Sequence, residues 1–180
     1  MAIFKPDSIF SKALNEVLLS EGGYVNDPTD RGGVTNKGVT QVVYDSFRLS
    51  KELPKQSVKN ITSEEVAELY YNRYWLPSGC SQMPPKLAFV VFDTAVNMGI
   101  GKPIDYFQEL IYTKEKRWGA KLKNDLAYYL SKHDEATLVA AFLERRKTSY
   151  RRYAVGNQKV FLQGWLNRVA SVESFIKDLA

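Results

Sequence analysis

The sequence predicts a mainly α-helical fold with one small β-structured excursion close to its N-terminus. Over most of the 180 residues, apolar side chains recur at intervals of three and four, which is typical of helices with one buried face. Capping residues and prolines stand where several of these runs begin. Residues 24–41 lack this spacing and are rich in Gly, Pro, Asp and Thr, which favours turns and short strands. We expect about seven helices.

The first helix is expected over residues 8–20. Its apolar residues follow the i, i+3, i+4, i+7, i+8 template: Phe10, Ala13, Leu14, Val17 and Leu18. Gly22 and Gly23 end this helix, because glycine readily leaves the helical conformation. The stretch 24–41 is then expected to form one or two β-hairpins, with β-prone pairs at 34–35 and 39–40.

The next helix signal begins at Ile61. Thr62 can cap the helix, and Glu65 can complete a capping box with it. Ile61 can pack on Val66 as a hydrophobic staple. These signals predict a helix that continues to Trp75.

A helix over residues 87–98 is expected at the centre of the fold, because it is apolar on nearly every side. Glycines at 99 and 101 end it, and Pro103 suits the first position of the following helix. Further helices are expected near residues 122–130, 134–155 and 166–179.

The composition excludes several classes of protein. A single cysteine, Cys80, excludes an internal disulfide framework, and a single histidine, His133, argues against a zinc site or a Ser-His-Asp triad. We therefore expect neither a metal nor a cofactor. No apolar run approaches the ~20 residues of a membrane-spanning helix, so we expect no stable membrane insertion. The N-terminal residues show no signal-peptide pattern.

The net charge of +5 comes entirely from the second half of the chain. Residues 1–92 carry ten basic and ten acidic residues, whereas residues 93–180 carry fifteen and ten. Five of the basic residues fall within 145–152. Such a balance indicates a polyanionic partner: nucleic acid, an anionic membrane surface or an acidic cell wall. A solvated helix face explains the run 145–152 equally well.

Glu21 is the first candidate for chemistry. It lies three residues after Leu18 and four after Val17, so it continues the apolar face of the first helix. A carboxyl there is partly desolvated and close to the negative end of the helix dipole. Both effects favour the protonated form, which a general acid requires. The alternative is a glutamate that merely ends a helix in water.

The segment after Glu21 strengthens the functional interpretation. Asp30 follows a Pro-Thr pair, so it serves a turn or acts as a catalytic partner with about equal weight. Thr35 and Thr40 offer hydroxyls at short reach. A protonated Glu facing an Asp and a Thr on a hairpin could hold a glycosidic bond and a water molecule.

The run EGGYVNDPTDRGGVTNKGVT, residues 21–40, resembles the signature of glycoside hydrolase family 108, a family of lysozyme-like N-acetylmuramidases. The resemblance continues through residues 70–75 and 91–99 and reaches 164–169, so it extends over almost the whole chain. It implies a lysozyme-like α+β fold and cleavage of the β-1,4 bond between N-acetylmuramic acid and N-acetylglucosamine. It also implies that residues 1–92 form the hydrolase segment and that residues 93–180 form a helical peptidoglycan-binding region packed on it.

The resemblance also assigns roles to individual residues. Glu21 corresponds to the catalytic acid. In the wider lysozyme superfamily, an acid follows this Glu after nine residues, as Asp30 does here. A Thr follows the acid after six residues in phage lysozymes, whereas Thr35 follows after five. Asn97 resembles an Asn-x-Gly asparagine that lines the cleft, although it also suits a plain helix end. We expect Tyr24 and Trp75 to stack on sugar rings, and Thr35 and Thr40 to contact substrate.

Other functions stay open at this point. A lytic transglycosylase would use the same Glu on the same bond, and sequence does not separate the two. A non-catalytic wall-binding or secretion-associated protein would keep the fold without the chemistry. Nucleic-acid binding has only the basic second half in its favour and no recognition motif. We expect a monomeric phage or prophage endolysin, made in the bacterial cytoplasm and released to its partner, peptidoglycan, through a holin lesion, lysis or a secretion machine.

Overall fold

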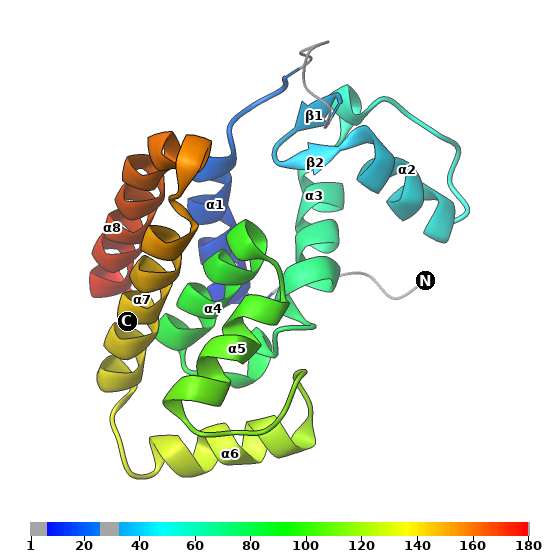
Figure 1. The fold of residues 1–180 in the computed structure, drawn as a ribbon. Helices are drawn as coiled ribbons and strands as arrows, with labels where there is room; N and C mark the ends of the chain where they lie inside the picture. The colour runs from blue at the N-terminus through cyan, green and yellow to red at the C-terminus, as the bar shows by residue number, and fades with distance from the viewer. Residues whose placement is uncertain (1–6, 26–32, 180) are drawn as a thin grey trace. The chain divides into compact units, whose positions relative to one another are not determined.

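The computed structural model describes residues 7–25 and 33–179 of the chain. Within them, eight α-helices and one two-stranded antiparallel sheet confirm the predicted mainly helical fold with an early hairpin (Figure 1). The chain divides into two units, residues 1–72 and 73–180, and each is described by itself.

The first unit begins with α1 (Ser8–Glu21), close to the range that the apolar spacing predicts. Asp7 caps this helix, since its Oδ1 accepts a hydrogen bond from the Phe10 backbone nitrogen at 2.6 Å. Gly22, with φ of 75°, ends it as expected. The hairpin then follows as β1 (Thr35–Asn36) and β2 (Val39–Thr40). Over residues 8–25 and 33–40, expected and observed structure therefore agree.

A helix that the apolar spacing does not predict, α2 (Gln41–Ser50), begins directly after β2. Its aliphatic residues mislead, because Val42 and Leu49 are 74% and 77% exposed. The buried face is carried by Tyr44 and Arg48 instead. Arg48 Nη1 lies 2.7 Å from Glu65 Oε1 on the next helix, so an ion pair takes part in this buried face.

The next helix, α3 (Ser63–Tyr70), has the capping box expected of Thr62 and Glu65. Ile61 and Val66 are both buried, as the staple requires. The helical path then continues to Trp75, but residues Tyr71–Trp75 form a π-helical turn instead of an α-helical one.

The second unit is built around α4 (Pro85–Met98), whose residues 87–95 are all buried. Three helices contact it: α5 (Gly101–Leu110), α7 (Glu135–Tyr153) and α8 (Leu162–Asp178). A further helix, α6 (Ala120–Leu130), runs across the lower edge of Figure 1. The expectation of a central apolar helix is confirmed within this unit.

Two details of this unit differ from expectation. Pro103 is the third residue of α5 instead of the first; the first-turn nitrogens of a helix have no intrahelical partner, so proline is accommodated there too. The boundary between the expected hydrolase segment and the expected peptidoglycan-binding region, at residues 92 and 93, falls inside α4, whereas the compact units divide between residues 72 and 73.

Asp93 joins three helices of the second unit through a buried ion triad. Its carboxylate on α4 lies 2.6 Å from Arg146 Nη1 on α7 and 2.8 Å from Arg168 Nη2 on α8. Asp93 is 2% exposed and Arg146 is fully buried. Burial alone would raise the pKa of Asp93, but the charges and hydrogen bonds of the two arginines hold that pKa below its usual range.

We predict that Asp93→Asn destabilises the protein by about 3–5 kcal/mol at neutral pH, because it removes the negative charge that pairs with the fully buried guanidinium of Arg146 and also binds Arg168. Since the folded pKa is depressed, the stabilisation by Asp93 is present above the pKa of an unfolded aspartate and is lost as pH falls through the folded pKa. The gap between wild type and variant, measured by denaturant unfolding, should therefore narrow in acid. Glu144→Gln, in an exposed pair with Lys147 on α7, serves as the control and should have little effect. Equal stability of Asp93→Asn and wild type at pH 7 would contradict this assignment.

Candidate active site

Glu21, the last residue of α1, lies against the turn of the β-hairpin. Its side chain is half-buried. A Cβ placed on Gly38 would lie 3.1 Å from Glu21 Oε2 and would collide with the Tyr70 hydroxyl. That hydroxyl donates a hydrogen bond to the Lys37 carbonyl at 3.0 Å. Glu21, the turn and Tyr70 therefore form one cluster in the first unit, which we call the Glu21 cluster.

The hairpin reaches Glu21 because of its tight turn. Thr35 pairs with Thr40 and Asn36 with Val39, which leaves only two residues in the loop. Both have positive φ, 51° at Lys37 and 73° at Gly38, as the two-residue turns that match strand twist require.

The hairpin is also held from the side by Asn36. This side chain is 8% exposed, and its amide donates to the Val58 carbonyl at 3.1 Å and to the Lys59 carbonyl at 3.2 Å. A buried amide with two partners resists displacement, because breaking either bond would leave a buried polar group unsatisfied. The turn beside Glu21 is thus fixed by its own geometry and by Asn36.

The three predicted substrate-binding residues of the first unit, Tyr24, Thr35 and Thr40, differ in the contacts that their side chains make. Tyr24 is 43% exposed, and the Lys59 ammonium lies 5.7 Å from the centre of its ring. Thr35 pairs with Val25 in a further β-bridge, and its hydroxyl donates to the Gly33 carbonyl at 3.3 Å. The Thr40 hydroxyl accepts from the Val43 nitrogen at 3.4 Å, so it caps α2. Of these three side chains, only Tyr24 presents an exposed aromatic ring to a ligand.

Asp30, the expected partner of Glu21, lies outside the described residues. Its position between Val25 and Gly33 places it in the connection that leads from α1 into the hairpin.

Trp75, expected to stack on a sugar, occupies a core position. It is 1% exposed and packs edge-on against Phe92, with ring centres 5.3 Å apart. An indole ring in this position has no free face for a ligand, so the expectation of sugar stacking by Trp75 is corrected. The apolar period that places the preceding helix does not tell a buried aromatic from an exposed one.

Asn97 lies exposed in the last turn of α4 and is held by the second unit's buried charges. Its side-chain oxygen accepts a hydrogen bond from the Tyr150 hydroxyl. The Tyr150 hydroxyl in turn accepts from Arg146 Nε at 3.0 Å, and Arg146 binds Asp93. Asn97 therefore has a fixed orientation that a free asparagine at a helix end would lack.

The basic run 145–152 is more structured than a solvated helix face. Three of its five basic side chains are paired: Arg145 with Glu109, Arg146 with Asp93, and Lys147 with Glu144 and Glu173. Arg151 and Arg152 are exposed, and no carboxylate in the described ranges forms an ion pair with them. Only these two are available to an external anion.

Metal chemistry has no candidate site in residues 7–25 and 33–179. No three His, Cys, Asp or Glu side chains there come together as ligands for an ion. The same ranges contain no helix long and apolar enough to cross a membrane.

The sequence pattern did not indicate Tyr70 as a neighbour of Glu21. The Lys37-Gly38 pair between two β-prone pairs does indicate a hairpin. Tyr70, by contrast, lies 49 residues after Glu21 in the chain, so no local sequence pattern predicts its place beside Gly38. The same holds for Tyr150, which reaches Asn97 from another helix.

Comparisons with known proteins found a family model that matches residues 14–99 and a solved structure that resembles the fold. Residues 14–99 match the model of the family Glycosyl hydrolase 108, and this range contains Glu21, the hairpin and α4. Over these residues the chain is therefore similar to a family of glycoside hydrolases. The solved structure of Brucella abortus SagA is similar, with a TM-score of 0.72 and 25% identity over 92% of this chain and 91% of that one. No curated protein matches the chain.

We predict that Gly38→Ala lowers stability and glycan hydrolysis more than Gly33→Ala does. Both glycines have positive φ, 73° and 71°, so both variants carry the strain of about 1–2 kcal/mol that a side chain meets there. Among the described residues, no atom lies within 4 Å of a Cβ placed on Gly33, whereas one at Gly38 meets Tyr70 and Glu21. Adding Tyr70→Phe to Gly38→Ala removes the hydroxyl and should recover part of the unfolding free energy. Equal losses for the two alanine variants would show that the Glu21 cluster is looser than described.

Proposed function

We propose that this chain is an N-acetylmuramidase, which hydrolyses the β-1,4 bond between N-acetylmuramic acid and N-acetylglucosamine in peptidoglycan, with Glu21 as general acid. The observation that carries the proposal is the Glu21 cluster: a half-buried carboxyl at a helix end, held beside a backbone turn, inside the segment that matches a glycoside hydrolase family.

The cluster suits proton transfer to a glycosidic oxygen. A general acid must lie within hydrogen-bond reach of the leaving oxygen in a fixed direction. The absence of a side chain at Gly38 leaves room for the Glu21 carboxyl beside the turn, and the Tyr70 hydroxyl anchors the neighbouring Lys37 carbonyl. These contacts restrict the rotamers of Glu21, so the carboxyl is positioned before substrate arrives.

A second carboxylate completes the usual glycosidase pair, either as a nucleophile or as a base that activates water. We assign this role to Asp30, nine residues after Glu21 in the connection to the hairpin. The exposed ring of Tyr24 and the oriented amide of Asn97 are proposed to contact the sugars. Thr35, which pairs with Val25 at the start of the hairpin, is proposed to offer its hydroxyl to the substrate.

We predict that Glu21→Gln lowers the rate of peptidoglycan hydrolysis by roughly 10²–10⁴, the usual contribution of a general acid, while the fold persists. Glutamine keeps the shape of the side chain and removes the proton that is transferred. Glu16→Gln is the matched control, since Glu16 is a half-buried glutamate on the same helix. The release of reducing sugar ends from purified peptidoglycan measures the rate, and circular dichroism checks folding. Activity of Glu21→Gln above a third of wild type would reject Glu21 as the acid.

Asp30→Asn is expected to lower kcat more than it weakens binding to peptidoglycan. Asparagine favours the same turns as aspartate, so a purely structural Asp30 would tolerate the change. Asp27→Asn, in the same short connection, is the control and should keep near-normal turnover. If the two variants behave alike, Asp30 is a turn residue and the second carboxylate lies elsewhere.

A further inference from the structure

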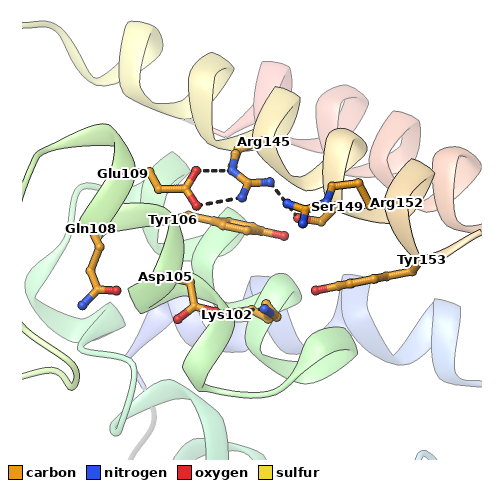
Figure 2. Close-up of a pocket in the computed structure, with 9 residues that line it drawn as sticks. All are labelled: Lys102, Asp105, Tyr106, Gln108, Glu109, Arg145, Ser149, Arg152 and Tyr153. Carbon is orange, nitrogen blue, oxygen red and sulfur yellow. Dashed lines mark hydrogen bonds and ion pairs between the residues drawn. The ribbon is translucent and has the colours of Figure 1, made fainter.

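A pocket of about 360 Å³ lies between α5 and α7, wholly within the second unit (Figure 2). Charged side chains and two tyrosines line most of it. Figure 2 shows Tyr106 and Tyr153 entering from opposite sides, with their hydroxyls directed toward one another. Pockets of a few hundred Å³ hold ligands of small-molecule size. The pocket contains no residue that the proposed hydrolysis uses.

The charges of this pocket do not balance. Two carboxylates, Glu109 and Asp105, each have a cation of their own. Arg145 binds Glu109 through Nε and Nη2, the Nη2 contact being 2.7 Å, and its Nη1 donates to the Ser149 hydroxyl at 3.1 Å. The Lys102 ammonium lies 2.9 Å from Asp105.

The third cation of the pocket, Arg152, has no such partner. It is exposed, and no carboxylate in the described part of the chain forms an ion pair with it. Glu109 stays ionised, because the hydrogen bond from Arg145 lowers the pKa of its carboxyl. The pocket therefore carries one surplus positive charge, which a ligand with one carboxylate would neutralise.

A second pocket, of about 340 Å³, adjoins the first. The two share Lys102 and Tyr153, so one continues into the other. The second pocket adds the half-buried ring of Trp165, which stacks on the buried ring of Tyr150 with centres 5.3 Å apart, together with the oriented amide of Asn97. Aromatic faces stack on the apolar faces of sugars, and an amide binds acetamido groups and hydroxyls.

We propose that the charged pocket binds a carboxylate of the peptide stem of peptidoglycan, through Arg152, while the attached amino sugar lies in the adjoining aromatic pocket. This proposal rests on the proposed function, because it takes peptidoglycan as the polymer. It assigns to the second unit a defined site for a carboxylate-bearing glycopeptide, in place of a diffuse attraction between a basic helix and an acidic wall.

The test uses the full chain and two probes, N-acetylmuramoyl-L-alanyl-D-isoglutamine and the same compound with its carboxylate converted to an amide. Binding is followed by NMR, which also reports which backbone amides move. We expect the carboxylate probe to shift the amides of Ser149 and Tyr153, and the amidated probe to bind at least roughly tenfold more weakly.

Two arginine variants separate a site from general electrostatics. Arg152→Gln should weaken binding of the carboxylate probe by at least roughly tenfold, the loss of one charge-assisted hydrogen bond. Arg151→Gln removes the same charge from the adjacent exposed residue, which does not line the pocket, and should leave binding unchanged. Equal effects of the two variants, equal binding of the two probes, or displacement of the probe by equimolar inorganic phosphate would each overturn the proposal.

The NMR titration is repeated on Glu21→Gln, so that failure of the pocket proposal can be distinguished from failure of the proposed function. It involves no bond cleavage and reads the second unit directly. Loss of hydrolysis with an intact titration leaves the pocket assignment standing. Hydrolysis of peptidoglycan without pocket shifts rejects the pocket and leaves the muramidase assignment standing.

Discussion

One buried carboxylate, Asp93, sets the arrangement of the second unit. It lies on the central helix and binds Arg146 from α7 and Arg168 from α8, so three helices meet at one negative charge. A buried triad of this kind tolerates little sliding, because any shift of a helix leaves a charge unpaired in a dry environment. Its influence reaches the surface through Tyr150, which links Arg146 to Asn97. Interior charge and surface amide thus belong to one connected network.

A steric constraint plays the corresponding part in the first unit. At Gly38 there is no room for a side chain, since the Tyr70 hydroxyl and the Glu21 carboxyl occupy that space. The tight turn therefore serves two purposes: it pairs the strands, and it brings backbone against the proposed acid. The two units contribute different parts of the account, because the first holds the proposed acid and the second holds a pocket with a surplus positive charge. Peptidoglycan carries both glycosidic bonds, on which the proposed acid acts, and carboxylates, which complement the charge of the pocket.

Much of this could be predicted from the sequence wherever the signal was local and apolar. The ends of α1, the capping box of α3 and the buried centre of α4 follow from caps and periodicity. The helix α2 is not predicted in this way: its buried residues are Tyr44 and Arg48, whereas the aliphatic Val42 and Leu49 are exposed. For the site, the sequence indicated Glu21 and the hairpin but not Tyr70, whose contact is non-local. Trp75 shows the opposite error, since an aromatic residue expected to stack on a sugar belongs to the core.

The central claim is that this chain hydrolyses the bond between N-acetylmuramic acid and N-acetylglucosamine with water as the acceptor. The most direct measurement is mass spectrometry of the fragments that the full chain releases from purified peptidoglycan in water enriched in heavy oxygen. The account predicts fragments that end in a reducing N-acetylmuramic acid and carry one oxygen atom from the solvent. Fragments with 1,6-anhydro ends, which contain no solvent oxygen, would contradict it and indicate a lytic transglycosylase. Reducing N-acetylglucosamine ends, or no fragments at all, would contradict it as well.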